Sequence, residues 1–368
     1  MKYYIIAGEA SGDLHGSNLM RGLLSEDREA EIRFWGGDMM ASVGGTLVHH
    51  YREGAVMGIS DVLKKAGKLL GNISECKKDI LAFGPDVVIL IDYPGFNLKI
   101  AGFCHSRGIR VFYYIAPKTW ASREGRNAKL RKYVDSLFIV FPFEIPYFTE
   151  KGVPFIYRGN PLIDAVDGHD FSRPTDGSYI ALLPGSRKGE ISRMMPVCME
   201  VADTLGCKVV IAGAPARSKE DYLPFIGDRK NVELVFGRTY DILKFADAAI
   251  INSGTASLEA ALIGTPQVVC WSTSALTIFV ARNILRVMDR IKYISLGNLC
   301  LDRMAFRELV QEDFTPENVC AEVSRLTGDS AYRGRMLADY DEIRRSLGES
   351  GASVSVAKAM IEELKRLG

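Results

Sequence analysis

Short runs of consecutive apolar residues alternate along the chain with longer amphipathic segments. Runs this short, bounded by Gly, Pro, Asn or Asp, are typical of buried parallel strands, and the longer segments are typical of helices. The pattern predicts strands at 3–7, 32–35, 86–91, 110–115, 137–140, 155–157, 179–183, 208–212, 232–236, 248–252, 267–270 and 293–296. Regular alternation of strand and helix predicts an α/β protein with parallel sheets.

The alternation is interrupted near the middle of the chain by the segment 164–177, which is rich in Asp, Gly, Pro and Ser. We interpret this segment as a linker between two doubly wound, Rossmann-like domains at 1–163 and 178–345. Two C-terminal helices follow, separated by glycines at 348 and 351. The sequence leaves open whether the tail, 346–368, packs on the N-terminal domain or on a partner subunit.

The charge and cysteine content exclude some classes of function. The net charge of +1 offers no overall basis for nucleic-acid binding. The 7 cysteines are scattered without a C-x-x-C pair, which indicates reduced thiols in a cytosolic protein. We find no signal peptide, no apolar run near the roughly 18 residues of a spanning helix, and no metal-ligand spacing of histidines.

The most informative stretch is 249–270, which predicts a strand, a small-residue loop, a helix and a second strand. We place the helix N-cap at Thr255 and its end at Gly264. The backbone N–H groups of Gly254, Thr255 and Ala256 would then face the strand's carboxyl end, where phosphates bind. Glu259, one turn into the helix, could accept hydrogen bonds from a ribose. An ordinary crossover with a solvated glutamate is the alternative.

In the first half, carboxylates follow two predicted strands. Glu9 and Asp13 lie in a Gly-bracketed loop after the first strand, and Asp92 directly follows the apolar strand 86–91. Ligands bind at such strand ends in open α/β sheets, so Asp92 is a candidate general base. The structural alternatives are helix caps: Asp13 would cap its own helix, and Asp92 would compete with Asn97 for the next.

Three further segments carry ambiguous chemistry. Pro184 to Glu190 combines a Gly loop, Arg187 and a helix start, which suits phosphate. The basic cluster 123–132 could steer an anionic substrate or be a solvated helix face. The apolar loop 54–59, followed by a lysine-bearing amphipathic helix, could touch a membrane or an apolar ligand, or could simply pack on the sheet.

Six of these stretches, in this order and spacing, resemble lipid-A-disaccharide synthases over nearly the whole chain. They are Gly8 to Asp13, Ala55 to Ile59, Ile91 to Asn97, Leu182 to Arg187, Ser253 to Glu259 and Tyr293 to Asn298. The resemblance implies a GT-B glycosyltransferase, in which two Rossmann-like domains face a cleft.

The resemblance further implies an inverting transfer from UDP-2,3-diacylglucosamine to 2,3-diacylglucosamine 1-phosphate, which yields lipid A disaccharide 1-phosphate and UDP. Such enzymes act peripherally at the cytoplasmic face of the inner membrane of Gram-negative bacteria. No metal or other cofactor is expected, and no nucleic-acid partner. Some members form homodimers through their C-terminal segments, so the oligomeric state stays open.

The resemblance assigns roles to three groups of residues in this chain. Asp92 is the expected base, and Glu9 orients a sugar hydroxyl or replaces Asp92 as base. The expected UDP-sugar contacts are Gly185, Ser186, Arg187, Ser253, Gly254, Thr255, Ala256, Glu259, Asn298 and Glu308. The expected acceptor or membrane contacts are Ser11, Asp13, Val56, Met57, Ile59, Asn97, Trp120 and Arg123.

The chain departs from the family pattern at 116–122 and at Gly297, where the family commonly has proline. These departures leave the details of the acceptor side and of the loop around Asn298 open. Two other functions are weighed against the transferase. A UDP-N-acetylglucosamine 2-epimerase would need no acyl-chain surface and would carry histidine-rich loops that this sequence lacks. A non-catalytic nucleotide-binding module would bind UDP without turnover. The acyl-chain length cannot be derived from the sequence.

Overall fold

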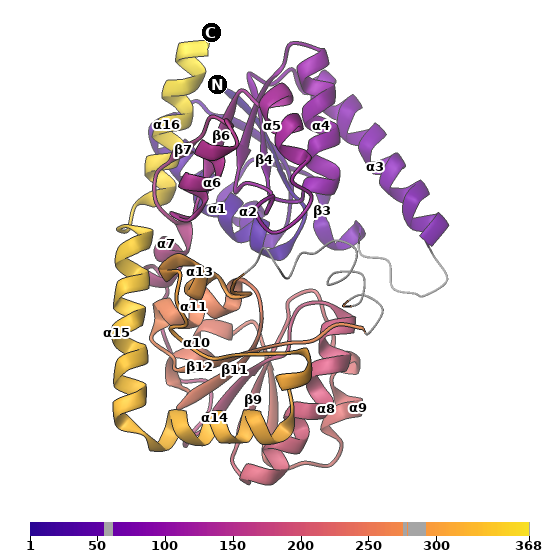
Figure 1. Cartoon of the computed structure of the whole chain (residues 1–368). Coiled ribbons are helices and arrows are strands. Elements are labelled where there is room, and N and C mark those ends of the chain that lie inside the picture. Colours follow the sequence, from indigo (N-terminus) through magenta and orange to yellow (C-terminus); the bar gives the residue numbers. More distant parts are fainter. Residues whose placement is uncertain (55–61, 275–277, 279–291, 368) are drawn as a thin grey trace. The chain divides into compact units, whose positions relative to one another are not determined.

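The computed structural model describes residues 1–54, 62–274, 278 and 292–367, which fall into two compact units (Figure 1). Unit 1 comprises Met1–Ala165 and Gly348–Gly368, and unit 2 comprises Val166–Leu347. Each unit holds one parallel sheet with connecting helices, so the predicted α/β fold with two Rossmann-like sheets is confirmed.

The sheet of unit 1 has seven strands in the order β3-β2-β1-β4-β5-β6-β7. Its strands are β1 (Lys2–Ala7), β2 (Glu31–Gly36), β3 (Thr46–His50), β4 (Val87–Ile91), β5 (Arg110–Tyr114), β6 (Ser136–Ile139) and β7 (Ile156–Tyr157). Its helices are α1 (Ala10–Glu26), α2 (Asp38–Val43), α3 (Val62–Phe83), α4 (Pro94–Ser106), α5 (Arg126–Tyr133), α6 (Glu144–Glu150), α7 (Pro161–Asp167) and α16 (Ala352–Leu367).

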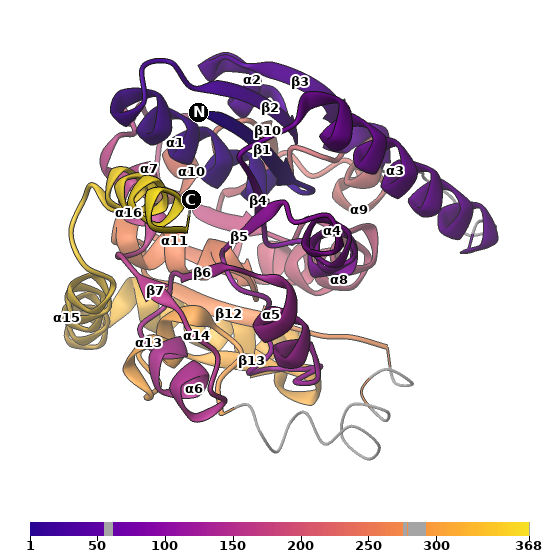
Figure 2. The same ribbon diagram turned by 90° about the horizontal axis from the view of Figure 1, so that it is seen from above.

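Helices cover both faces of this sheet, with α1, α2 and α16 on one side and α3, α4 and α5 on the other (Figure 2). All five residues of β4, Val-Val-Ile-Leu-Ile, are therefore buried, because a central parallel strand has no solvent face. The strand order reverses between β1 and β4. At such a reversal the connections leave in opposite directions, which opens a crevice at the carboxyl ends of the two strands.

The sheet of unit 2 has six strands in the order β10-β9-β8-β11-β12-β13. Its strands are β8 (Ile180–Leu183), β9 (Val209–Gly213), β10 (Val232–Phe236), β11 (Ala248–Asn252), β12 (Gln267–Trp271) and β13 (Glu308–Val310). Its helices are α8 (Lys188–Leu205), α9 (Leu223–Ile226), α10 (Thr239–Phe245), α11 (Thr255–Ile263), α13 (Leu296–Leu301), α14 (Pro316–Gly328) and α15 (Ser330–Leu347). Here the order reverses between β8 and β11.

The helix predicted after residue 254 is present with one shift. α11 begins at Thr255, so Gly254 and not Thr255 is the N-cap residue, in extended backbone without a side-chain cap. Gly264 ends α11 in the left-handed conformation, with φ 89, and its N–H bonds the carbonyls of Ala260 and Ala261. This is the conformation that glycine adopts most readily, as predicted from the sequence.

The C-terminal helix α16 belongs to unit 1, where it lies against α1 (Figure 1). Gly22 of α1 permits the close approach, because a Cβ at this position would lie 3.0 Å from the Cβ of Ala357. Asp164 accepts hydrogen bonds from the N–H groups of Gly351 and Ser353, at 2.6 and 2.7 Å. A carboxylate at a helix N-terminus stabilises it.

The segment 164–177, which the composition predicts as a linker, makes specific contacts within the two units. It starts within α7, and its Asp164 holds α16. Farther along, His169 and the N–H of Ser172 bond the buried carboxylate of Asp241, at 3.1 and 3.0 Å. Polar residues of this segment therefore form specific hydrogen bonds within each unit. The boundary between the two units lies at its N-terminal end, between Ala165 and Val166.

One further predicted element is wrong, and the edge strands β3 and β13 were not predicted. The run 293–296 is not a strand: the N–H groups of Ile294 and Ser295 bond the Glu308 carboxylate, and α13 starts at Leu296. The edge strand β3 was not predicted, because its residues are exposed or half-buried and lack an apolar run.

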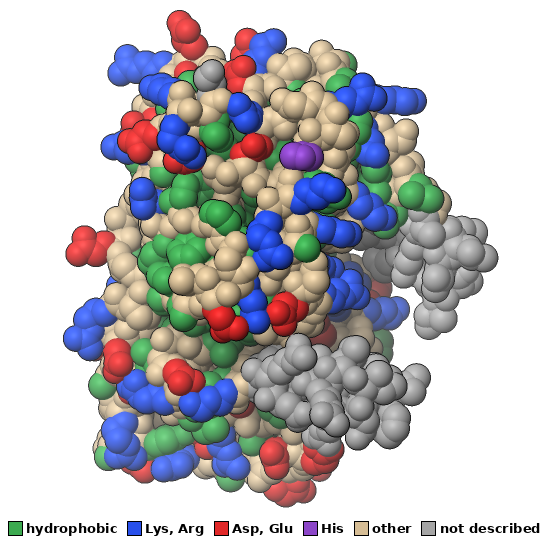
Figure 3. Space-filling view, turned by 45° about the horizontal axis from the view of Figure 1, so that its top comes forward, with side chains coloured by type: hydrophobic (Ala, Val, Ile, Leu, Met, Phe, Trp, Pro, Cys, Tyr) green, Lys and Arg blue, Asp and Glu red, His purple; other side chains and the backbone are tan. Residues whose placement is uncertain are grey.

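Figure 3 shows both signs of charge distributed over the visible face, in keeping with the nearly balanced composition. Within the described part of the chain, none of the helices combines the length and apolarity needed to cross a bilayer.

Candidate active site

The carboxylates of Asp92 and Glu9 follow the two strands between which the order of the first sheet reverses. β1 and β4 pair in parallel, with Ala7 opposite Ile91. Asp92 directly follows β4, and Glu9 follows β1 after one glycine. Burial raises the pKa of the Asp92 carboxyl; Lys118 lowers this pKa and Glu9 raises it. The structure thus brings the two predicted catalytic carboxylates to one sheet edge.

Asn97, expected to contact the acceptor, instead supports the backbone of the β4–α4 turn. Its side chain is 0% exposed, and its Nδ2 donates to the carbonyls of Ile91 at 3.1 Å and Asp92 at 2.8 Å. It does not cap α4 through its side chain either, since Tyr93 is the N-cap residue of that helix. Its amide is committed to two buried carbonyls, so it is a supporting residue.

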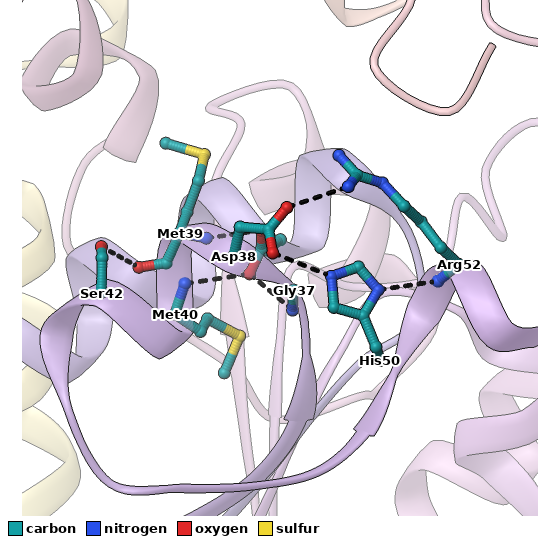
Figure 4. Close-up of polar contacts among 8 residues, drawn as sticks. Gly37, Asp38, Met39, Met40, Ser42, His50 and Arg52 are labelled. Carbon is teal, nitrogen blue, oxygen red and sulfur yellow. Dashed lines mark hydrogen bonds and ion pairs between the residues drawn. The ribbon is translucent and has the colours of Figure 1, made fainter. Parts of the chain in front are cut away.

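Asp13 is neither an acceptor contact nor the cap of its own helix. It is buried in the first turn of α1, and its carboxylate accepts hydrogen bonds from the N–H groups of Gly37, Met39 and Met40, at 2.8, 3.1 and 3.0 Å. Figure 4 shows this N-terminal turn of α2. Asp13 therefore caps α2, which follows a different strand, a partner that spacing along the chain does not reveal.

The same close-up shows how α2 is tied to the end of β3 (Figure 4). Asp38 bonds Arg52 at 2.9 Å and the ring of His50 at 3.3 Å. The N–H of Arg52 in turn bonds His50 Nδ1 at 3.1 Å. The predicted acceptor or membrane residues Val56, Met57 and Ile59 lie outside the described residues.

The remaining predicted acceptor residues lie around the first sheet's carboxyl edge. Ser11 is half-buried in the first turn of α1. Trp120 is half-buried and meets the ring of Phe143 edge to face at 5.1 Å. Arg123 is exposed in a left-handed turn, with φ 57. Arg126 follows on α5; burial and the charge of Arg123 lower its pKa, whereas the nearby Asp92 carboxylate raises it.

In unit 2, the loop from Gly185 to Arg187 follows β8 at the reversal of the second sheet. β8 pairs with β11, with Leu183 opposite Ile251. Gly185 has φ 104, and a Cβ there would lie 2.6 Å from Nδ2 of Asn252, so glycine is required. The loops after β8 and β11 therefore adjoin, as two phosphate-binding loops of one site would.

The β8 loop has a partner that our sequence analysis missed. Glu190 accepts hydrogen bonds from the N–H groups of Ser186 at 3.0 Å and Arg187 at 3.1 Å, and from Arg187 Nη1 at 2.9 Å. These two backbone groups are therefore not free for phosphate in this structure. The Arg187 side chain is 71% exposed. The three-residue spacing to Glu190 is a capping-box signal that could have revealed it.

The loop after β11 presents the N-terminus of α11 at the same edge. The first N–H groups of a helix have no carbonyl of their own helix to bind, so they attract anions. Ser253 donates through its Oγ to the carbonyl of Ile294 at 3.0 Å. Glu259 lies one turn into α11, and its Oε1 accepts a hydrogen bond from Tyr240 OH at 2.9 Å. Burial raises the pKa of Glu259, and the tyrosine hydrogen bond lowers it.

Asn298 and Glu308, expected to contact the UDP-sugar, bind each other and the surrounding backbone in this structure. Asn298 is 0% exposed; its Nδ2 donates to Phe306 O and Glu308 Oε1, and its Oδ1 accepts from the N–H groups of Ala305 and Phe306. Glu308 also binds the N–H groups of Ile294 and Ser295. Both residues hold the segment 293–298, which Ser253 ties to the start of α11. Gly297 has no room for proline, since a Cβ would lie 2.8 Å from the ring of Phe306.

Comparison with known proteins identifies the family. The family model for lipid-A-disaccharide synthetase matches residues 3–356. The chain belongs to the lipid-A-disaccharide synthase family. Lipid-A-disaccharide synthase of Geobacter metallireducens is 36% identical over 98% of this chain and 96% of the relative, and that of Myxococcus xanthus is 36% identical over 98% and 97%.

Solved structures agree on the fold. The UDP-GlcNAc 2-epimerase of Neisseria meningitidis, bound to UDP-GlcNAc, superposes with a TM-score of 0.69 at 13% identity, over 98% of this chain and 100% of that one. The calicheamicin glycosyltransferase superposes with a TM-score of 0.59 at 15% identity, over 100% and 98%. At such low identity these two structures support only the fold of this chain and say nothing about its chemistry.

Proposed function

We propose that this protein joins UDP-2,3-diacylglucosamine to 2,3-diacylglucosamine 1-phosphate with inversion, releasing UDP and lipid A disaccharide 1-phosphate. The observation that carries the proposal is the match of the family model to residues 3–356. The paired carboxylates of Asp92 and Glu9 support it, since an inverting transfer needs a base beside the acceptor hydroxyl.

In the proposed mechanism Asp92 takes the proton of the acceptor hydroxyl while the hydroxyl oxygen attacks the anomeric carbon of the donor. The bond between that carbon and the UDP oxygen breaks, and its electron pair leaves with the diphosphate. A general base is most effective when its pKa lies near the working pH. The raised pKa of Asp92 therefore makes its carboxylate a more effective base at neutral pH. Glu9 orients a sugar hydroxyl from the neighbouring strand.

Unit 2 holds the donor in this proposal. The exposed guanidinium of Arg187 and the N-terminal N–H groups of α11 stabilise the negative charge that develops on the departing diphosphate. Glu259 accepts hydrogen bonds from the ribose hydroxyls through the oxygen that Tyr240 leaves available. Asn298 and Glu308 act indirectly, because they hold the segment 293–298 against the start of α11.

We further propose that the protein works peripherally on the cytoplasmic face of the inner membrane. The apolar sequence of 55–59 and the lysines that follow it support this, since apolar residues can enter a bilayer while lysines meet anionic headgroups. Changing Val56, Met57 and Ile59 to serine should weaken sedimentation with anionic vesicles and leave UDP affinity intact. Unchanged sedimentation would argue for simple packing of this segment.

The function is tested by incubating the protein with the acylated donor and acceptor and following disaccharide and UDP by mass spectrometry. Formation of both products in equal amounts is the expected result. Conversion of UDP-N-acetylglucosamine to its 2-epimer would instead indicate an epimerase. UDP binding without any product would indicate a non-catalytic nucleotide-binding module.

A further inference from the structure

The backbone around Asp92 adopts a conformation that side chains disfavour. Asp92 and Tyr93 are consecutive residues in the left-handed region, with φ 42 and φ 44. For residues with a Cβ this region is sterically unfavourable, and two in succession are rarer still. Such a conformation persists only where surrounding contacts hold it in place.

Three hydrogen bonds hold the main chain of Asp92 directly. Its N–H donates to the carbonyl of Tyr114 at 3.1 Å. Its carbonyl oxygen accepts from Tyr113 OH at 2.6 Å and from Asn97 Nδ2 at 2.8 Å. Both polar backbone atoms of Asp92 are thus anchored to β5 or α4, and the carbonyl has both of its acceptor positions filled.

The two side-chain donors are buried and cannot reach a substrate. Tyr113 and Asn97 are each 0% exposed. Burial raises the pKa of Tyr113 well above its ordinary value, so its hydroxyl stays protonated and remains a donor. A residue of this kind can influence chemistry only through the group it holds.

The neighbouring tyrosine shows that the hydroxyl is not a requirement of packing in β5. Tyr114 is also 0% exposed, but within the described part of the chain its hydroxyl has no hydrogen-bond partner. The two tyrosines are equally buried on one strand, but of their two hydroxyls only that of Tyr113 has a hydrogen-bond partner among the described residues. Only the Tyr113 hydroxyl contacts Asp92, the residue that directly follows β4.

We propose that Tyr113, together with Asn97, is a positioning residue that fixes the strained Asp92 backbone and so aims its carboxylate at the acceptor hydroxyl. The proposal rests on the proposed function, in which Asp92 is the base. Without the Tyr113 hydroxyl, the carbonyl of Asp92 loses one of its two donors, and the turn can relax toward a more favourable φ. The carboxylate would then move away from its aligned position.

The first test compares the full-length variants Tyr113→Phe and Tyr114→Phe. For Tyr113→Phe we expect kcat to fall about 10- to 100-fold, the usual scale for a misplaced catalytic group, with the KM for the UDP-sugar unchanged. Tyr114→Phe, which removes an equally buried hydroxyl from the next residue, should keep wild-type kinetics. Wild-type kcat in Tyr113→Phe would overturn the proposal, and so would an equal loss in both variants.

Asn97→Leu provides a second variant of nearly the same size, which removes the Nδ2 donor without placing a charge beside Asp92. It should show the same selective loss of kcat, which keeps the proposal testable if Tyr113→Phe does not fold. A loss confined to thermal stability, with normal kcat in the folded fraction, would contradict positioning.

A readout without turnover separates this proposal from the proposed function. The Asp92 carboxyl can be titrated by carbon NMR, with its resonance assigned from Asp92→Asn. We expect Tyr113→Phe to displace both its chemical shift and its titration midpoint, and Tyr114→Phe to leave both in place. If the wild type forms no disaccharide, the proposed function fails, but this comparison still decides whether Tyr113 holds Asp92. An unchanged Asp92 titration in Tyr113→Phe overturns the inference.

Discussion

The side-chain amide of Asn298 donates to the carboxylate of Glu308 at 2.8 Å, so two residues that the sequence suggested as donor contacts bind each other. Asn298→Ala would leave buried partners at Ala305 and Phe306 without hydrogen bonds. We expect the free energy of unfolding to fall by about 3 kcal/mol, the scale for buried groups left unsatisfied. UDP affinity should fall too, because segment 293–298 loses its support; urea unfolding and calorimetry measure the two effects.

Asp302 provides the control for this prediction. It follows α13, it is exposed, and its carboxylate pairs with Lys292 on the surface that the structure describes. Asp302→Asn keeps a residue that tolerates the left-handed φ of 50 and removes only the charge, so it should change stability by less than about 1 kcal/mol, as exposed ion pairs do. Full stability of Asn298→Ala would show that its hydrogen bonds are dispensable.

Asp92→Asn should abolish turnover while the protein still folds and binds UDP. The amide has nearly the same size but cannot accept the hydroxyl proton, and loss of a general base costs about 10²- to 10⁴-fold in rate. In the wild type, kcat should drop as the pH falls through the raised pKa of Asp92, because the base becomes protonated. Rate measurements against pH and UDP titrations test this. A near-wild-type kcat would make Glu9 the next candidate.

Glu259→Gln should weaken the discrimination between UDP and its 2′-deoxy analogue. A carboxylate accepts stronger hydrogen bonds from ribose hydroxyls than a side-chain amide does. Hydrogen bonds to charged groups contribute about 1.5–3 kcal/mol. We expect wild-type affinity for UDP to exceed that for the deoxy analogue, and the variant to bind both with similar, lower affinity. Calorimetric titration of both ligands measures this. Undiminished discrimination in Glu259→Gln would place the ribose elsewhere.

Glu144→Gln should stabilise the protein at alkaline pH. Glu144 is buried, its Oε2 accepts from the N–H groups of Val140 and Phe141, and burial raises its pKa from 4.5 to about 7. Because the folded pKa is the higher one, stability is fully present below the unfolded value and is lost as pH rises through about 7. The advantage of glutamine should therefore grow between about pH 5 and about pH 8 in thermal melts.

Glu150→Gln, on the same helix, is the matched control. Glu150 is exposed and pairs with Lys151, so Glu150→Gln should not reproduce the growing advantage of Glu144→Gln between about pH 5 and about pH 8. A glutamine at 144 that lowers the melting temperature equally at every pH would refute the titration argument.

Disaccharide formation should survive treatment with excess EDTA. In the proposed site Arg187 and the N-terminus of α11 take the place of a metal at the diphosphate. Within the residues that the structure describes, no group of three or more His, Cys, Asp or Glu side chains is arranged to hold an ion. Product formation is measured with and without chelator. Activity that disappears with EDTA and returns with magnesium would contradict this prediction.

The sequence determined the two sheets and the positions of their strand-end loops. An entirely apolar strand such as β4 is possible only with both faces covered, so residues 87–91 specify a central parallel strand wherever the chain around them goes. Asp92 follows from the same local pattern, since it comes directly after that strand. Gly264 was equally predictable, because ending a helix in the left-handed conformation is a property of one residue.

Only the tertiary structure decided what the polar side chains bind. Asp13 caps α2 and not its own helix, Glu308 holds the N–H groups of Ile294 and Ser295, and Tyr113 reaches the carbonyl of Asp92 from the next strand. Hydrophobic burial depends on many contacts at once, so buried strands and helix faces can be recognised from apolar runs and periodic apolar positions in the sequence. A hydrogen bond depends on two atoms at about 3 Å, and which two meet is fixed by the packing of elements distant along the chain.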